Sequence, residues 1–182
     1  MKFTEQKIKG VWVIEPQVFN DARGYFMESY KQNLFEEYIG VVNFIQDNES
    51  KSSRGVLRGL HYQTGEFAQA KLVRVIKGAV LDVAVDIRKS SPTFGQYVSV
   101  ELTEDNKKQL FVPRGFAHGF LVLKDDTVFS YKVDNTYAPQ HEASIVWNDS
   151  VVNVDWGIEE SELLLSPKDK SGKLLADAIL FE

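Results

Sequence analysis

The fold is decided by one stretch of the chain, Ala79-Val80-Leu81-Asp82-Val83-Ala84-Val85-Asp86-Ile87-Arg88. Every odd position in it is apolar, whereas Asp82, Asp86 and Arg88 occupy even positions. Successive side chains of an extended chain point to opposite faces, so a period of two predicts a β-strand rather than a helix. A strand of this kind needs partners, and the rest of the chain supplies them.

Short runs of similar character recur on both sides of this stretch. They are separated by turn signals such as Lys77-Gly78, Ser91-Pro92-Thr93 and Asp125-Asp126. About ten strands at this spacing predict an all-β sandwich or barrel. Besides residues 79–88, we expect strands at residues 10–14, 24–30, 41–46, 56–63, 71–76, 97–102, 109–112, 119–123, 128–133 and 144–147.

Helical signals are confined to two places. Residues 33–39 end at Gly40 and predict a helix of two turns, and residues 173–180 predict a C-terminal turn or helix. Neither segment could form a helical core, and there is no internal repeat or low-complexity linker. We expect a single domain, residues 1–182, with N-terminal strands and a short helix in 1–50, a barrel in 51–150 and a C-terminal extension in 151–182.

Composition narrows the class of protein. A chain of 182 residues with 43% hydrophobic side chains can bury a core without disulfides or a structural metal. It has no cysteine and therefore no thiol for catalysis or metal binding. The imidazoles available for chemistry are those of His61, His118 and His141. A net charge of -5 disfavours binding to nucleic acid. No apolar run exceeds four residues and the N-terminus lacks a signal-peptide core, so we expect a cytoplasmic protein without a membrane partner.

The first candidate site is the strand Val56-Leu57-Arg58-Gly59-Leu60-His61-Tyr62-Gln63. A histidine among apolar residues on a strand is usually a buried core residue. Strand parity places His61 and Arg58 on opposite faces, unless one of the neighbouring glycines marks a bulge that turns both side chains inward. A bulge of this kind beside a cavity would favour a functional role for both residues.

A second candidate is the turn Pro113-Arg114-Gly115-Phe116-Ala117-His118. Its Pro-x-Gly-x-x-His spacing resembles the second motif of the cupins, small jelly-roll barrels that often hold a metal. Metal cupins also carry a His-x-His pair, which this chain lacks, so a site with three histidines would need His141 from a loop. We therefore expect a cavity that uses its histidines in acid-base or hydrogen-bonding roles, with a metal cupin as an alternative.

Two further strands carry polar groups among apolar neighbours. Alternation places Lys71 and Arg74 on opposite faces of one strand, so one of them points into the barrel. The alternative is a solvent-facing pair of cations with no role in a site. A lysine facing a cavity would instead stabilise a developing oxyanion. On the other strand, Tyr131 shares a face with Phe129 and Val133, as a core tyrosine or as a proton donor.

Taken together, these segments resemble the dTDP-4-dehydrorhamnose 3,5-epimerase family, cupin-like enzymes of nucleotide-sugar metabolism that use no metal. The resemblance covers nearly the whole chain and implies a cupin-like double-stranded β-helix, or jelly roll, with a few short helices. The order of its segments is specific. They are Asp21–Glu28, Phe44–Asn48, Val56–Gln63, Lys71–Arg74, Asp82–Arg88, Ser91–Gly95, Val112–Phe120, Tyr131-Lys132 and Ile145–Asp149.

The resemblance also implies the roles of individual residues. His61 is the general base, Asp169 orients it, and Tyr131 is the general acid on the opposite face of the sugar. Lys71 lies near the substrate as a fourth catalytic residue. The implied substrate-binding residues are Arg23, Phe26, Glu28, Gln46, Asn48, Arg58, His118, Glu142 and Lys168. Family members form homodimers that exchange N-terminal strands, so the first three would complete the site of the neighbouring subunit.

The activity implied is epimerisation at C3 and C5 of dTDP-4-keto-6-deoxy-D-glucose to dTDP-4-keto-L-rhamnose, in dTDP-L-rhamnose biosynthesis and without a cofactor or metal. A hydrogen beside the C4 ketone is acidic because its loss gives an enolate, and a histidine can accept it. Two alternatives remain beside the metal cupin. One is an epimerase that inverts only C3 or only C5, and the other is a non-catalytic barrel that binds nucleotide sugars. The sequence leaves open whether Asp82 supports His118.

Overall fold

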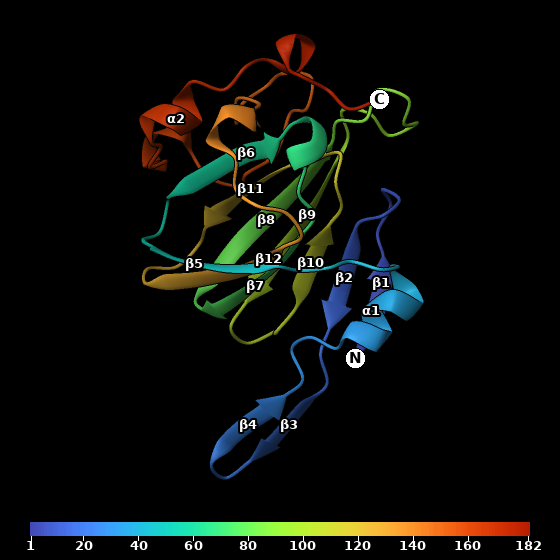
Figure 1. The fold of residues 1–182 in the computed structure, drawn as a ribbon. Helices are drawn as coiled ribbons and strands as arrows, with labels where there is room; N and C mark the ends of the chain where they lie inside the picture. The colour runs from blue at the N-terminus through green and yellow to red at the C-terminus, as the bar shows by residue number, and fades with distance from the viewer.

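The chain folds into two antiparallel β-sheets that pack face to face, and the computed structural model describes all residues 1–182 (Figure 1). The six-stranded sheet has the order β1 (Lys2–Glu5), β2 (Trp12–Glu15), β10 (Gln109–Val112), β7 (Lys71–Lys77), β12 (Thr127–Val133) and β5 (Gln46–Ser52). The five-stranded sheet has the order β13 (Glu142–Ser144), β6 (Leu57–Gln63), β11 (Phe116–Val122), β8 (Ala79–Asp86) and β9 (Tyr97–Thr103). The predicted all-β jelly roll is therefore confirmed.

The space between the sheets is filled at one end by an apolar core. Val73, Val75 and Phe129 come from the six-stranded sheet, and Val80 and Ala84 come from β8 of the other sheet. The even positions of β8 thus face the barrel interior. Asp82 and Asp86, also at even positions, are fully buried. The two aspartates of the stretch that defines the fold therefore do not face solvent.

The outer faces of both sheets are covered as well. Val83 and Val85, at odd positions of β8, pack under the C-terminal segment with Trp156 and Leu175. This segment lies over the five-stranded sheet in Figure 1. On the six-stranded sheet, α1 (Gln32–Tyr38) buries Phe35 in a cluster with residues of β2, β7 and β10. Because both faces are covered, every residue of β11 is buried.

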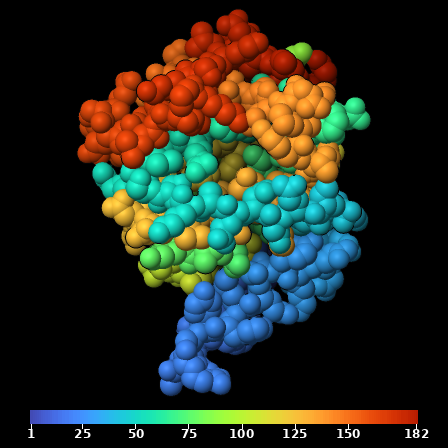
Figure 2. Space-filling view, turned by 60° about the vertical axis from the view of Figure 1, so that its left-hand side comes forward, coloured from blue at the N-terminus to red at the C-terminus, as the bar shows by residue number.

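A hairpin of β3 (Val18–Asp21) and β4 (Gly24–Met27) projects from this body (Figures 1 and 2). Its aromatic side chains are exposed, with Phe26 65% accessible and Phe19 and Tyr25 each 53% accessible. The hairpin is held at its base, where Gln109 Nε2 donates to the Ser29 carbonyl at 2.7 Å. A two-stranded hairpin is only marginally stable in water, so this one needs a covering surface.

A bulge shapes the pairing of β6 with β11. His118 pairs with His61 and Phe120 pairs with Arg58, so the two residues between them on β6 oppose a single residue of β11. The backbones approach closely here, because a Cβ added at Gly119 would lie 2.7 Å from the Cα of Gly59. The bulge alternative is confirmed, since both His61 and Arg58 line the cavity described below.

Several predicted elements are wrong or displaced. The strand expected at 41–46 is absent, and the chain pairs instead over β5. The inward side chains of β5 are polar because they face a cavity, so no apolar alternation marks it. The turn or helix expected at 173–180 is a shorter 3-10 turn, Leu175–Asp177, whereas α2 (Pro167–Lys170) was not predicted. β1 and β3 were also missed.

Other boundaries shift by a few residues. The strand expected at 24–30 ends at Met27, the one at 119–123 begins at Phe116, and the one at 144–147 is β13, Glu142–Ser144. Three more 3-10 turns complete the structure, at Gly65–Phe67, Pro139–His141 and Glu160–Glu162. None of the helices combines the length and the apolar character that a membrane span requires.

Candidate active site

A cavity of about 830 Å³ lies between the two sheets, under the C-terminal segment. Figure 2 shows a hollow at this level, between the teal atoms of β5 and β6 and the orange and red atoms that follow β12. A smaller cavity of about 340 Å³ adjoins it and shares His61, Lys71, Tyr131, Tyr137 and Glu142. The structure thus gathers most of the predicted site residues: Arg58, His61, Lys71, His118, Tyr131, Glu142, Lys168 and Asp169 in the larger cavity, and Gln46 and Asn48 in the smaller one.

His61 on β6 faces a carboxylate from the C-terminal segment. Its Nε2 lies 3.1 Å from Asp169 Oδ1, at ion-pair distance, and has no other hydrogen-bond partner in the chain. Burial opposes the charge of Asp169. The contact with His61 and the hydrogen bonds from Ser166 and Gly59 outweigh burial and lower the pKa of Asp169 to about 2. Asp169 is therefore a permanent anion beside the imidazole.

The sequence Ser166-Pro167-Lys168-Asp169 explains why this carboxylate is in place. Ser166 caps α2, a proline occupies its first turn, and the Asp169 side chain returns to the backbone N–H of Ser166 at 3.2 Å. This is a capping box, which satisfies donors at the start of a helix. Ser166 was not among the predicted site residues, although its spacing from Asp169 matches the capping pattern.

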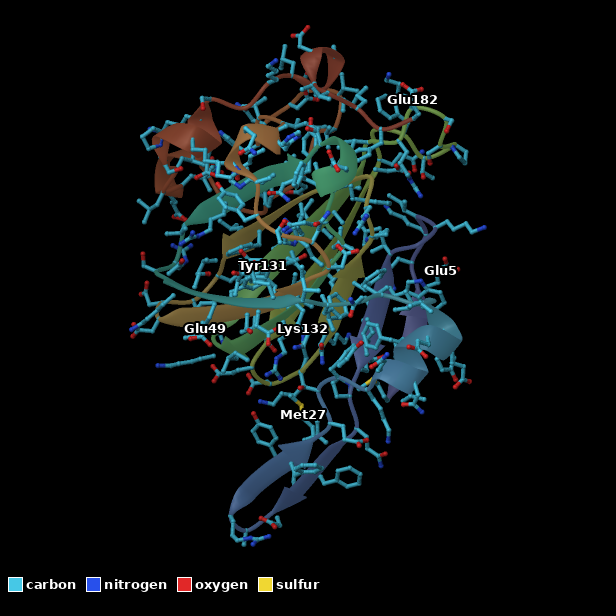
Figure 3. All side chains as sticks on the ribbon, in the orientation of Figure 1. Glu5, Met27, Glu49, Tyr131, Lys132 and Glu182 are labelled. Carbon is cyan, nitrogen blue, oxygen red and sulfur yellow. The ribbon has the colours of Figure 1, made fainter.

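Tyr131 enters the cavity from the opposite sheet. It lies on β12, packed against Phe129 with 5.9 Å between ring centroids. Figure 3 shows Tyr131 inside the barrel, whereas its neighbour Lys132 leaves the strand on the other side. Burial raises the pKa of the Tyr131 phenol, and the positive charge of Arg58 offsets part of this effect. The phenol therefore carries its proton at neutral pH.

Of the two cations predicted to lie on opposite faces of β7, Lys71 faces the cavity and Arg74 lies on the outer face, next to Gln109 and Ser130. The Lys71 ammonium forms no ion pair within the chain. Burial lowers its pKa to about 8, although the negative charges of Asp82 and Glu142 oppose this effect. A buried, unpaired ammonium in a cavity is poised to contact an anionic or developing oxyanionic group.

The structure resolves the relation between Asp82 and His118. Asp82 Oδ1 lies 2.9 Å from His118 Nε2, and this aspartate is fully buried. Its other oxygen, Oδ2, has no hydrogen-bond partner in the chain. Asp82 therefore supports His118 from inside the barrel and adds a negative charge near Lys71.

A network of three side chains lies on the cavity wall. Glu142 accepts a hydrogen bond from the Tyr137 hydroxyl at 2.9 Å and pairs with the Lys168 ammonium. Burial would raise the pKa of Glu142, but these two partners lower it. Tyr137 was not predicted, because it lies in a loop where no periodic pattern sets it apart.

Three predicted binding residues lie outside the cavity of their own chain. Arg23 pairs with Asp21 at 2.6 Å on the hairpin turn, and Glu28 pairs with Lys31 at 3.2 Å. Phe26, on the hairpin itself, is exposed. His141 is also outside the cavity, where its ring packs at a tilt against Phe67 with 4.3 Å between centroids. No three His, Asp or Glu side chains cluster closely enough to hold a metal ion.

Two antiparallel sheets form a barrel with ionisable groups on both inner walls. This architecture places the protein in the class of cupin jelly rolls with a polar interior cavity. Residues 5–177 match the model of the dTDP-4-dehydrorhamnose 3,5-epimerase family. The chain is 52% identical over 182 residues to the dTDP-4-dehydrorhamnose 3,5-epimerase of Shigella flexneri, covering 100% of this chain and 99% of that protein.

Solved structures agree with the sequence match. The dTDP-4-dehydrorhamnose 3,5-epimerase of Elizabethkingia anophelis is 52% identical, with a TM-score of 0.94 over 97% of each chain. The dTDP-6-deoxy-D-glucose-3,5-epimerase of Legionella pneumophila, solved with dTDP-4-keto-L-rhamnose, is 47% identical, with a TM-score of 0.93 over 97% of this chain and 93% of that one. The chain belongs to the dTDP-4-dehydrorhamnose 3,5-epimerase family and is an isomerase.

Proposed function

We propose that the protein epimerises C3 and C5 of dTDP-4-keto-6-deoxy-D-glucose and releases dTDP-4-keto-L-rhamnose for dTDP-L-rhamnose biosynthesis. The observation that carries this proposal is the placement of two groups on facing walls of one cavity. The His61–Asp169 pair belongs to the wall formed by β6 and α2, and Tyr131 belongs to the wall formed by β12. A sugar between these walls presents one face to a base and the other to an acid, as inversion requires.

The proposed chemistry begins beside the C4 ketone. His61 accepts the proton from C3, and the C–H electron pair forms the enolate with its charge on the C4 oxygen. The Lys71 ammonium stabilises that oxygen, which is most effective where water is excluded. Tyr131 then donates its proton to C3 on the opposite face and recovers a proton from solvent, as His61 releases one. Repeating these transfers at C5 inverts the second centre.

The remaining polar side chains of the cavity suit the nucleotide diphosphate. Arg58 has a planar guanidinium that can bind phosphate oxygens through two hydrogen bonds. Lys168 adds a second cation, held by Glu142. Gln46 and Asn48, joined by a hydrogen bond of 2.8 Å, supply amides in the smaller cavity. This arrangement accounts for a cluster of cations inside a protein whose net charge is -5.

In this proposal the hairpin β3–β4 belongs to the site of a second copy of the chain. Arg23, Phe26 and Glu28 are far from their own cavity and exposed on an element that needs a covering surface. A two-fold dimer that exchanges hairpins satisfies both copies at once, because one contact is repeated by symmetry. Phe26 would then stack on the thymine, and Arg23 would reach the diphosphate.

The test is the reaction in D2O with the purified protein, followed by NMR of the sugar. We expect solvent deuterium at both C3 and C5 and formation of dTDP-4-keto-L-rhamnose. Deuterium at only one carbon would replace this proposal with a single epimerase. Tight binding of dTDP with no exchange at either carbon would replace it with a binding protein. Loss of exchange on chelation, restored by a metal ion, would favour a metal cupin.

A further inference from the structure

Each oxygen of the Asp169 carboxylate has its own partners. Oδ1 accepts from the Gly59 backbone N–H at 3.2 Å and lies 3.1 Å from His61 Nε2. Oδ2 accepts from the Ser166 hydroxyl at 2.5 Å and from the Ser166 backbone N–H at 3.2 Å. The side chain of Asp169 is only 6% exposed, so water contributes little to its orientation.

The Ser166 hydroxyl is the strongest of these restraints. The terminal torsion of an aspartate is broad, so hydrogen bonds decide how its carboxylate is rotated. The bond from Ser166 Oγ is an O–H···O⁻ bond to a charged acceptor, which is a stronger kind than the bonds from the backbone N–H groups. His61 Nε2 contacts Oδ1 at 3.1 Å without forming a full hydrogen bond, whereas Ser166 makes two hydrogen bonds to Oδ2. Ser166 therefore decides which oxygen faces the ring.

We propose that Ser166 is a positioning residue of the general-base pair. Its hydroxyl holds Asp169 so that Oδ1 faces Nε2 of His61, which keeps the proton of the neutral ring on Nε2. The lone pair of Nδ1 is then available as the base. Ser166 acts through Asp169, and its role rests on the proposed function of His61. The capping box of α2 thus serves the reaction as well as the helix.

The chain offers a matched control on the same short helix. Ser171, at the other end of α2, donates its hydroxyl to the Lys168 carbonyl at 3.0 Å and has no contact with Asp169. Ser171→Ala therefore removes a hydroxyl from α2 but leaves the carboxylate unchanged. Ser166→Thr is the conservative variant, because threonine keeps a hydroxyl and also caps helices.

The first experiment compares the deuterium-exchange kinetics of these variants with the wild type. In Ser166→Ala we expect kcat to fall about 10- to 100-fold, the size of effect typical for removing a group that orients a functional histidine, while KM changes little. Losing a hydrogen bond to its charged form raises the pKa of Asp169, so the acidic limb of the pH profile moves to higher pH. Ser166→Thr should recover most of kcat, and Ser171→Ala should match the wild type.

Two results would overturn the proposal. One is a folded Ser166→Ala variant with the kcat and pH profile of the wild type. The other is a fall in activity that is equal at every pH and matches a loss of folded protein in the melting curve, since a purely structural cap would behave in that way.

The second experiment requires no turnover, so it separates this proposal from the proposed function. With three histidines in the chain, the ring nitrogens are assignable by NMR, and His61→Asn identifies the signals of His61. We expect the Nε2–H tautomer in the wild type and a mixture in Ser166→Ala. If the wild type fails to exchange protons at C3 or C5 but this difference is found, the epimerase assignment fails and the positioning role stands. An unchanged tautomer in Ser166→Ala contradicts the positioning role.

Discussion

Burial shifts the pKa values of two residues on the same wall of the cavity in opposite directions. It lowers the pKa of Lys71 to about 8 and raises that of Tyr131, because it disfavours the charged form of each group. At neutral pH both side chains still carry their protons, as an ammonium and a phenol. The facing wall carries the charged carboxylate of Asp169. The proposed proton donors therefore lie on the six-stranded sheet, and the proposed base pair lies opposite them on β6 and α2.

The alkaline limb of the pH profile should come from Lys71. Its ammonium loses its proton as the pH rises through about 8, so kcat/KM should decline above that pH. Lys71→Arg should remove this decline, because a guanidinium stays charged over the whole range. Lys71→Met should be slow at every pH. A wild-type profile that stays flat to pH 10 would exclude Lys71 as the charge that stabilises the enolate.

The base and the acid can be distinguished by what each variant still does. His61→Asn should lose proton exchange and inversion together, by about 10²- to 10⁴-fold, the contribution of a general base. Tyr131→Phe should still exchange the proton on the base face but form little inverted product. His141→Asn is the control, since this ring packs against Phe67 outside the cavity. If Tyr131→Phe lost proton exchange as completely as His61→Asn does, the assignment of Tyr131 as the acid would be contradicted.

At the scale of elements, the bulge in the pairing of β6 with β11 determines where the side chains of His61 and Arg58 point. A methyl group at Gly119 would lie 2.7 Å from the Gly59 Cα and 2.8 Å from the Arg58 carbonyl oxygen, and neither backbone atom can move freely. Gly119→Ala should therefore destabilise the protein by about 1–3 kcal/mol, as overpacking does. Chemical denaturation measures this, and an unchanged midpoint would show that the strands can separate without cost.

The same elements show how far the sequence predicts the fold. β10 has the predicted bounds because its side chains alternate between the barrel core and a second apolar cluster. β5 was missed because Gln46, Asn48 and Ser50 point toward cavities, so the strand carries polar residues where a core strand has apolar ones. Local rules fail where the chain serves a site instead of the core.

The candidate site was predictable in part for similar reasons. Alternation established that one of Lys71 and Arg74 faces inward, and the structure selects Lys71. The contact of Asp82 with His118 depends on the register of β8 against β11, which no local pattern contains. Tyr137 reaches the cavity from an irregular loop. Contacts set by pairing between distant strands, or by loop geometry, require the structure.

At the scale of the whole molecule, the hairpin and the cavity each lack a partner that the other could provide. The hairpin exposes aromatic side chains and the guanidinium of Arg23, whose ion-pair partner within its own chain is Asp21 of the same hairpin. The cavity carries the proposed base, acid and oxyanion-stabilising groups, but the only exposed aromatic ring beside it that could contact a thymine is Tyr137. In the proposed dimer, exchange of hairpins between two copies would supply both missing partners, because each copy has what the other lacks.

Mixing two inactive variants tests this exchange. His61→Asn damages the cavity but leaves the hairpin intact, whereas the double variant Arg23→Ala, Phe26→Ala damages the hairpin but leaves the cavity intact. A heterodimer of the two has one doubly damaged site and one site in which both parts are intact. Random exchange of equal amounts makes half of the dimers mixed, so about a quarter of all sites should regain activity. If mass spectrometry shows mixed dimers while the activity remains the sum of the separate variants, each hairpin serves its own chain and the exchange is excluded.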